Sequence, residues 1–279
     1  MLSLVRRLIT QLQAPARKPL KDFPLHGFEP CRRQPCLIDD LSDGELVELN
    51  ALLPWKCFTT DNHGRRFGNP AWAGKRTAPE TMPDRRIRLM HERFDLSNKK
   101  VLEVGCFEGA HTIGIGDFAK EVVAVDSRVE NVTKTIVRCA AYGRHPLVTL
   151  RDIDRGPFEG GQFEADVMHH VGVLYHLKDP VTHLLSLGSY VGAGIMLDTH
   201  YSEDENADSV YEVRGRRYRY WRYREWGHSD PFSGMYDHSK WLRLEDIQSL
   251  LRQAGFVRCE VVERRAEPGG PRVLLLAER

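Results

Sequence analysis

One stretch of the chain decides the fold class: Lys100-Val-Leu-Glu-Val-Gly-Cys-Phe-Glu-Gly109. In it, the short apolar run Val101–Val104 leads into a turn that contains Gly105 and Gly109, and a segment long enough for a helix begins at His111. Glycines in such a turn let the backbone approach a ligand where a Cβ atom would collide. The stretch therefore predicts a buried strand, a ligand-binding turn and a helix, in that order.

The alternation of strand and helix continues beyond this stretch. Four more apolar runs follow, at Glu121–Asp126, Leu147–Asp152, Ala165–His170 and Gly194–Thr199. The segments that suit helices are His111–Phe118, Val129–Tyr142 and Pro180–Tyr190. Short apolar strands that alternate with helices indicate an α/β protein with a doubly wound, mainly parallel sheet.

The C-terminal part predicts the closing elements of this sheet. Amphipathic spacing predicts a helix over residues 239–256, which Gly255 would end. Two apolar runs, Val257–Val262 and Arg272–Ala277, are separated by a loop rich in proline and glycine. We expect these two runs to form an antiparallel pair of strands.

The first hundred residues have a different texture. Five prolines between residues 14 and 40 indicate an irregular arm. Helices are predicted over residues 2–12, 41–53 and 84–94, the second capped by Ser42 or Asp43, with a turn-rich stretch between the last two. The expected segments are an N-terminal extension (1–50), a cap on the substrate side (51–98), a ligand-binding core (99–200), a lid or acceptor insertion (201–238) and a C-terminal helix with closing strands (239–279).

Composition excludes several classes of protein. The 279 residues include 40 Lys and Arg and 39 Asp and Glu, so an overall positive field that would bind nucleic acid is absent. The six cysteines lack the density of a disulfide scaffold and the spacing of a zinc ribbon. No apolar run approaches the ~20 residues of a membrane span, and Arg6 and Arg7 interrupt the N-terminal apolar stretch. We expect a cytoplasmic protein without a membrane span, with a homo-oligomer left open.

The ligand of such a sheet lies beyond the carboxyl ends of its strands. Asp126 follows the glycine turn by about 20 residues, the separation at which a carboxylate meets ribose hydroxyls. A dinucleotide loop would read G-x-G-x-x-G, whereas here Gly105 and Gly109 are separated by three residues. Glu103 and Glu108 would repel a pyrophosphate but tolerate a sulfonium cation. The pattern favours S-adenosylmethionine over a nicotinamide dinucleotide.

Several motifs carry a family resemblance. Glu103–Gly109, Asp126, Asp152-Ile153 and Val171–His176 resemble successive motifs of the class I S-adenosylmethionine-dependent methyltransferases. More narrowly, Leu52-Leu-Pro-Trp-Lys56, Gly172–His176 and Pro271–Ala277 resemble the branch that contains the bacterial tRNA wobble-uridine carboxymethyltransferase. The resemblance implies a Rossmann-like sheet of seven strands and a methyl or carboxymethyl transfer.

The resemblance also implies a donor site, position by position. Asp126 would hold the ribose, Asp152 would accept from the adenine amino group, and Ile153 would pack on the adenine ring. Phe107 departs from the family because it stands at the usual middle glycine, so its side chain must turn out of the pocket or the loop must differ. The implied donor residues are Glu103, Gly105, Cys106, Phe107, Gly109, Asp126, Ser127, Asp152, Ile153, His170, Val171 and Tyr175.

The choice between two donors rests on three positions. The carboxymethyltransferases grip a carboxylated S-adenosylmethionine with a lysine, a tyrosine and an arginine, and Tyr175 and Arg272 match two of these. Lys56 lies one position early, and Cys57 stands where the lysine should be. Loss of one cation would remove a charge-assisted hydrogen bond of about 1.5–3 kcal/mol. We therefore expect ordinary S-adenosylmethionine, with the carboxylated donor as the alternative.

Methyl transfer to a hydroxyl or amine requires alignment and a proton acceptor. The candidate bases are His176, Asp198 and His200. Asp198 and His200 are two residues apart on an extended segment, so they point to the same side and could instead hold a divalent metal; the expectation is that no metal is bound. The candidate acceptor-binding residues are Trp55, Lys56, Tyr175, Arg217 and Arg272.

The stretch Arg214–Arg224 alternates arginine with aromatic residues. It suits recognition of an acceptor, or else an exposed strand of a hairpin or an oligomer contact. Trp55, Trp72, Trp226 and Trp241 are candidates to line the same mouth. The expected function is methyl transfer to a small-molecule or glycan acceptor. The alternatives are a tRNA-modifying methyl- or carboxymethyltransferase and a binding protein that keeps the fold without catalysis, and a nicotinamide oxidoreductase is poorly supported.

Overall fold

The computed structural model describes residues 23–71, 77–156, 158, 161–267 and 269–279. The chain divides into two compact units, Met1–Glu80 and Thr81–Arg279. The helix predicted over residues 2–12 and the side chain of Trp72 lie outside the described residues. No helix in the described ranges is both long and apolar enough to cross a membrane.

The first unit contains two helices and a small hairpin. Its elements are α2 (Leu37–Asp40), α3 (Asp43–Leu52), β1 (Phe58–Thr60) and β2 (Arg66–Gly68). Ser42 caps α3 as predicted, because its Oγ accepts from the Glu45 N–H while the Glu45 carboxylate accepts from the Ser42 N–H. The hairpin falls in the stretch that the sequence marks only as rich in turns.

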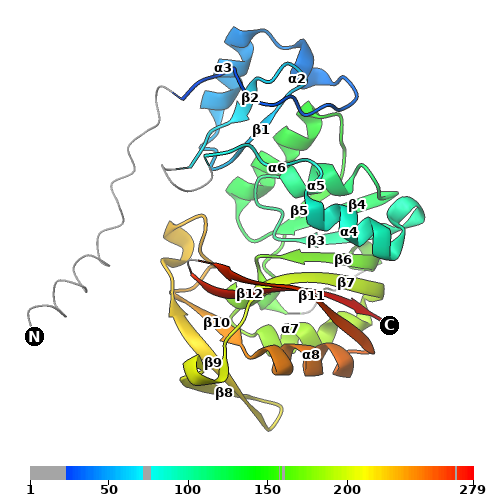
Figure 1. Cartoon of the computed structure of the whole chain (residues 1–279), viewed down its shortest axis with the longest axis vertical. Coiled ribbons are helices and arrows are strands. Elements are labelled where there is room, and N and C mark those ends of the chain that lie inside the picture. The colour runs from blue at the N-terminus through cyan, green and yellow to red at the C-terminus, as the bar shows by residue number, and fades with distance from the viewer. Residues whose placement is uncertain (1–22, 72–76, 157, 159–160, 268) are drawn as a thin grey trace, which may run out of the picture. The chain divides into compact units, whose positions relative to one another are not determined.

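A seven-stranded sheet forms the second unit, in the order β11-β12-β7-β6-β3-β4-β5 (Figure 1). The five strands β3 to β7 are parallel, and β12 pairs antiparallel with both β7 and β11. This confirms the doubly wound sheet and its antiparallel closing pair. The strands are β3 (Lys100–Val104), β4 (Glu121–Asp126), β5 (Leu147–Leu150), β6 (Ala165–Val171), β7 (Val191–His200), β11 (Arg258–Glu267) and β12 (Gly270–Glu278).

Helices cover the sheet and create its core. They are α4 (Arg85–Phe94), α5 (Ala110–Ile115), α6 (Val129–Ala141), α7 (Pro180–Ser186) and α8 (Leu244–Gln253). One apolar cluster joins the sheet to α7 and α8, and a second joins it to α4 through Ile87, Met90 and Phe94. Phe94 needs a glycine beneath it, because a Cβ at Gly194 would lie 2.3 Å from its ring. Such packing favours one placement of α4 on the strands.

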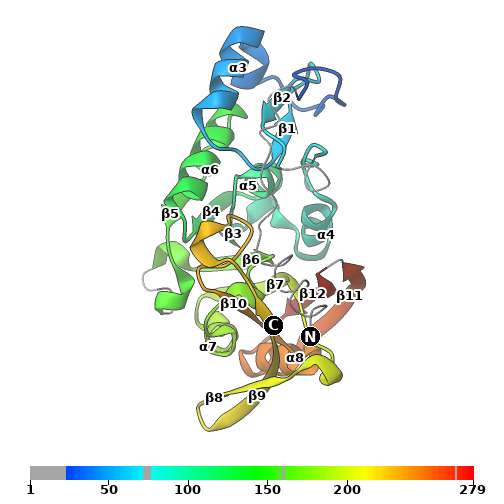
Figure 2. The same cartoon turned by 90° about the vertical axis from the view of Figure 1, so that its left-hand side faces the viewer.

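The insertion after β7 forms a separate three-stranded antiparallel sheet of β8 (Ser209–Val213), β9 (Arg216–Arg224) and β10 (His238–Leu242). The hairpin of β8 and β9 projects beyond α8 (Figures 1 and 2). The arginine–aromatic stretch is β9, in which Tyr218 and Tyr220 are buried while the arginines are exposed. The stretch is thus one strand of a hairpin, and its part in acceptor recognition stays a prediction.

The helix predicted over residues 239–256 is wrong in its first part. Residues 239–242 belong to β10, where Trp241 lies opposite Trp221 of β9, and α8 begins only at Leu244. The helical periodicity of one segment carries no information about a distant partner strand. The pairing of β10 with β9 therefore could not be predicted from it.

Candidate active site

The glycine turn lies between β3 and α5, where the strand order reverses. Gly105 has φ +74°, and a Cβ there would lie 2.2 Å from the Val173 side chain. Gly109 has φ +82°, and a Cβ there would press on the backbone of Thr135. Because β3 pairs with β4 on one side and β6 on the other, this turn opens at the switch point of the sheet.

The structure shows how Phe107 fits at the position where the family usually has a glycine. Its backbone has φ +51°, the left-handed region that a glycine adopts without strain. Its ring centroid lies 5.6 Å from that of Phe232, in the connection between β9 and β10. The loop therefore keeps a left-handed backbone at this position, and the aromatic side chain packs against another segment.

Asp126 ends β4 with its carboxylate buried and ordered. Oδ2 accepts from the Phe107 N–H at 3.1 Å, and Oδ1 accepts from the Arg128 N–H at 2.9 Å and from Asn131 Nδ2 at 3.1 Å. Burial raises the pKa of Asp126 in spite of these hydrogen bonds. Its donors fix the carboxylate at the carboxyl end of the sheet, where a ligand with hydroxyl groups could reach the remaining lone pair of Oδ2.

The neighbouring strand ends carry other residues that the sequence predicts for the site of the methyl donor. Asp152 begins a 3₁₀ turn after β5, and its Oδ1 accepts from the Asp154 N–H at 3.1 Å. Ile153 is partly buried beside it, and Ser127 follows Asp126 directly. Cys106 lies buried within the glycine turn. Its Sγ accepts a hydrogen bond from Thr135 Oγ1 of α6 at 3.4 Å, which supports the turn. These residues lie together at the carboxyl ends of the strands, because β4 and β5 are adjacent and parallel.

Glu103 and His169 lie in register on β3 and β6 below the turn. Both are buried, with Glu103 Oε1 and His169 Nδ1 3.8 Å apart, and Glu103 accepts from Thr112 Oγ1 at 2.5 Å. These two residues and His111 are of metal-ligating types and lie near one another. However, His111 Nε2 is 3.2 Å from Arg86 Nη2, whose positive charge opposes a cation there, so the group carries no metal assignment.

Glu103 should make stability depend on pH. Its burial raises the pKa to about 7, from 4.5 in the unfolded chain, so the folded protein retains a proton that the unfolded chain releases between these values. The free energy of unfolding therefore falls as the pH rises from about 4.5 to 7, because the buried carboxylic acid resists losing its proton. Glu103→Gln should stabilise the protein at pH 8 by on the order of 3 kcal/mol, and by much less at pH 5, in chemical denaturation. Glu121→Gln on the exposed start of β4 is the control, and an equal effect of Glu103→Gln at both pH values would contradict this origin.

His170 and Val171 end β6. His170 is buried, and its Nε2 lies 3.0 Å from His183 Nε2 of α7. Burial lowers the pKa of both imidazoles, that of His183 to about 4, so the pair is neutral near pH 7. The described contacts of His170 thus tie β6 to α7, whereas Val171 is half-buried at the strand end.

Asp198 lies near the end of β7, fully buried among three arginines. Its carboxylate accepts from Arg86 Nη1 at 3.2 Å, from Arg265 Nη2 at 2.9 Å and from Arg272 Nε. Burial alone would raise the pKa of Asp198, but these guanidinium groups outweigh it and lower the pKa. A carboxylate held ionised by three cations is a poor proton acceptor. This environment argues against Asp198 as the base, and suits it instead to orient the arginines.

His176 forms a dyad with a residue that the sequence did not single out. Its Nδ1 lies 2.7 Å from the nearer carboxylate oxygen of Glu225, 49 residues further along the chain. Glu225 also accepts from the Gly234 N–H at 2.7 Å and from Ser239 Oγ. Burial would raise the pKa of Glu225, but these hydrogen bonds outweigh it and lower the pKa. An ionised carboxylate on Nδ1 leaves Nε2 of the imidazole as its proton acceptor.

Aromatic and basic side chains surround this dyad. The Tyr175 ring lies 4.8 Å from the His200 ring, which stacks on Trp241 at 4.3 Å. A Cβ at Gly172 would lie 3.4 Å from Arg272 Nη2 and 3.9 Å from the Tyr175 hydroxyl, so both groups face this strand end. His200 Nδ1 lies 3.1 Å from the Pro271 carbonyl, and burial lowers its pKa.

Two of the remaining predicted acceptor residues belong to the first unit and one belongs to the insertion. Trp55 is buried in the first unit against Phe67, and Lys56 belongs to the same unit. Arg217 is exposed on β9, opposite Glu212 of β8. The structure thus gathers Tyr175, His176, His200 and Arg272, and leaves Arg217 on the hairpin.

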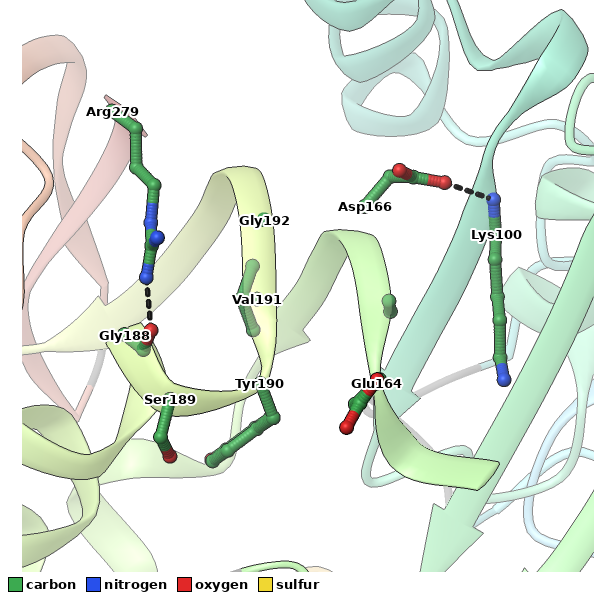
Figure 3. A pocket seen from close by; sticks show the side chains of 10 residues that line it. Lys100, Glu164, Asp166, Gly188, Ser189, Tyr190, Val191, Gly192 and Arg279 are labelled. Carbon is green, nitrogen blue, oxygen red and sulfur yellow. Dashed lines mark hydrogen bonds between the residues drawn. The ribbon is translucent and has the colours of Figure 1, made fainter. Parts of the chain in front are cut away.

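A hollow of about 370 Å³ lies at the amino ends of the parallel strands. Figure 3 shows the side chains that line it. It lies where β6 and β7 begin, and Asp166 Oδ2 accepts there from the Lys100 N–H at 2.8 Å. Parallel α/β sheets bind ligands at the carboxyl ends of their strands, so this hollow is separate from the candidate site. Its lining residues are Lys100, Glu164, Ala165, Asp166, Gly188, Ser189, Tyr190, Val191, Gly192 and Arg279.

Comparison with known proteins gives curated relatives and solved structures. The tRNA U34 carboxymethyltransferase of Shewanella loihica is 31% identical over 194 residues, which cover 64% of this chain and 53% of the relative. That of Shewanella piezotolerans is 31% identical over 189 residues, which cover 63% and 53%. The chain therefore spans about half the length of these curated relatives.

Among solved structures, the N-terminal domain of EvdMO1 with SAH bound aligns with a TM-score of 0.71 and 22% identity, over 85% of this chain and 97% of that one. The same domain in the presence of SAH and D-fucose gives 0.68 and 23%, with the same coverage. These likenesses show a shared fold. The profile of the methyltransferase domain matches residues 75–261. The chain therefore belongs to the methyltransferase domain family and has the Rossmann-like fold of class I S-adenosylmethionine-dependent methyltransferases.

Proposed function

We propose that this chain transfers a methyl group from S-adenosylmethionine to a hydroxyl group of a small molecule or glycan. The observation that carries the proposal is the His176–Glu225 dyad at the carboxyl end of the sheet, beside Tyr175. A hydroxyl must lose a proton as it is methylated, and a histidine oriented by a buried carboxylate is suited to take that proton.

The glycine turn and Asp126 would hold the donor, which supplies an electrophilic methyl group when bound. Glu225 would hold Nδ1–H of His176, so that Nε2 takes the proton of the acceptor hydroxyl. The fold neighbour crystallised with SAH and D-fucose supports sugars as the first acceptors to test. Tyr175, which is half-buried beside His176, is the aromatic side chain on which a sugar ring would pack.

A second candidate is tRNA modification with a carboxylated donor, as the names of the curated relatives suggest. The convergence of Arg272 Nη2 and the Tyr175 hydroxyl over Gly172 favours it, because both could bind an extra carboxylate. Against it, the Arg272 guanidinium already pairs with Asp198 and Glu267. The intact mass of a donor that copurifies with the protein distinguishes the plain sulfonium from the carboxylated one.

We expect His176→Ala and Glu225→Gln each to reduce kcat for methyl transfer by about 10²–10⁴-fold, the usual contribution of general-base catalysis. The binding constant for S-adenosylmethionine should change little, because neither side chain belongs to the glycine turn. Product formation on a panel of monosaccharides and nucleotide sugars, followed by mass spectrometry, measures the effect.

The matched control is His238→Ala, which breaks an exposed histidine–aspartate pair with Asp237 on the same small sheet. It should leave kcat unchanged. A wild-type protein that binds no S-adenosylmethionine in calorimetry would refute the enzyme and leave the non-catalytic alternative. Turnover of His176→Ala at the wild-type rate would refute only the dyad.

A further inference from the structure

The connection between β9 and β10, residues 225–237, packs against both halves of the proposed active site. We call it the closing segment. Phe232 lies on Phe107 of the glycine turn, and Glu225 binds His176. A Cβ at Gly234 would lie 2.8 Å from the His176 side chain, so the segment also passes close to the base. It therefore touches the residues expected around the donor and around the acceptor.

One buried arginine fastens this segment. Arg128 is 9% exposed, and its Nη1 donates to the carbonyl oxygen of His228 at 2.7 Å. Its Nη2 lies 3.1–3.2 Å from four further carbonyl oxygens, those of Gly227, Asp230, Ser233 and Gly234. The planar guanidinium presents several donors in fixed directions, which a single ammonium group cannot reproduce.

Arg128 also belongs to the donor side through its backbone. Its N–H donates to Asp126 Oδ1 at 2.9 Å, the carboxylate proposed to hold the ribose. The main chain of one residue thus orients the proposed ribose acid, while its side chain gathers the carbonyl groups of the closing segment. A ligand held at Asp126 would lie next to the residue that fastens the segment.

We propose that Arg128 is a positioning residue that holds the closing segment against the glycine turn, slows release of the donor and keeps Glu225 aligned with His176. The proposal rests on the proposed function for the identity of the donor. It does not depend on which acceptor is methylated. Because five carbonyl oxygens of the segment converge on this one guanidinium, a single substitution should loosen it.

Hydrogen exchange and donor release test the proposal together. In Arg128→Ala, backbone amides of residues 225–237 should exchange at least about tenfold faster, since tenfold corresponds to ~1.4 kcal/mol and several hydrogen bonds are lost. The dissociation rate of S-adenosylhomocysteine, measured by stopped-flow fluorescence, should rise by a similar factor. In Arg128→Lys, the exchange rate and the ligand dissociation rate should both lie between those of the wild type and of Arg128→Ala. The lysine keeps the positive charge but lacks the planar set of guanidinium donors.

The matched control is Arg219→Ala, which removes a guanidinium that donates to the carbonyl groups of Ala207 and Asp204 elsewhere in the insertion. Exchange of residues 225–237 and ligand release should stay at wild-type values in this variant. Unchanged exchange or unchanged ligand release in Arg128→Ala would overturn the proposal, as would the same acceleration in Arg219→Ala. If wild-type protein binds no S-adenosylhomocysteine, the proposed function fails, and exchange of the unliganded protein still tests whether Arg128 fastens the segment.

Discussion

Replacing Asp126 by alanine is expected to weaken binding of S-adenosylmethionine by about 10–10²-fold. The charge-assisted hydrogen bond from a ribose hydroxyl to Oδ2 would be lost, worth about 1.5–3 kcal/mol, and every 1.4 kcal/mol is tenfold in affinity. The loss should also loosen the glycine turn, because the Phe107 N–H would lose its acceptor. Isothermal calorimetry measures the change directly.

Asp126→Asn separates charge from shape. It keeps the size of the side chain but removes the ionised acceptor, so it should retain the fold and still bind at least about tenfold more weakly. The control is Asp117→Asn, whose carboxylate accepts from Arg144 at 2.7 Å near the surface. A folded Asp126→Asn protein that binds within threefold of wild type would remove Asp126 from the donor site.

Asp198→Ala should produce the largest loss of stability among single side-chain changes at the site, about 3–5 kcal/mol. Removal of one partner from a buried ionic cluster leaves the others uncompensated, and here three guanidinium groups would lose their shared carboxylate. Glu267 also pairs with Arg265 and Arg272 and would partly compensate their charges. We therefore expect a loss of stability at the lower end of this range. Chemical denaturation at pH 7 measures it.

The pH dependence of stability provides a second test of the same cluster of Asp198 and three arginines. The pKa of Asp198 is lowered in the folded protein, so its stabilising contribution is complete above the unfolded value of about 3.9 and is lost as the pH falls through the lower folded value. The difference between wild type and Asp198→Ala should therefore be constant from pH 8 to pH 5 and shrink only below about pH 4. Asp237→Ala, which alters an exposed carboxylate, should leave stability close to that of the wild type. A loss below 1 kcal/mol in Asp198→Ala would contradict the arginine cluster.

The core of the fold follows from local sequence because each of its strands is a short apolar run that ends in a turn. The run Glu121–Asp126 coincides with β4, and Val129–Tyr142 exceeds α6 by a single residue. β10 could not be predicted, because the partner that makes residues 239–242 a strand lies on β9. The same limitation hid the hairpin of the first unit, whose strands have three residues each.

The candidate site divides in the same way. The glycine turn and Asp126 are visible because their spacing along the chain reflects a fixed local geometry. Glu225 is not, since only the tertiary fold brings it to His176. Asp198 was placed correctly at a strand end, but its arginine partners come from α4, β11 and β12 and reverse its expected chemistry. Distant partners, which sequence spacing does not reveal, decide the role of a titratable side chain.

The insertion leaves and rejoins the core at a single place. Ser202 forms a parallel bridge with Arg243, and its N–H donates to the Leu242 carbonyl at 2.9 Å. A segment whose ends already meet can change in length at little entropic cost to the rest of the fold. A change in the length of the connections within residues 203–241 should therefore disturb the large sheet little, provided that Tyr218 and Tyr220, which pack into its core, are kept.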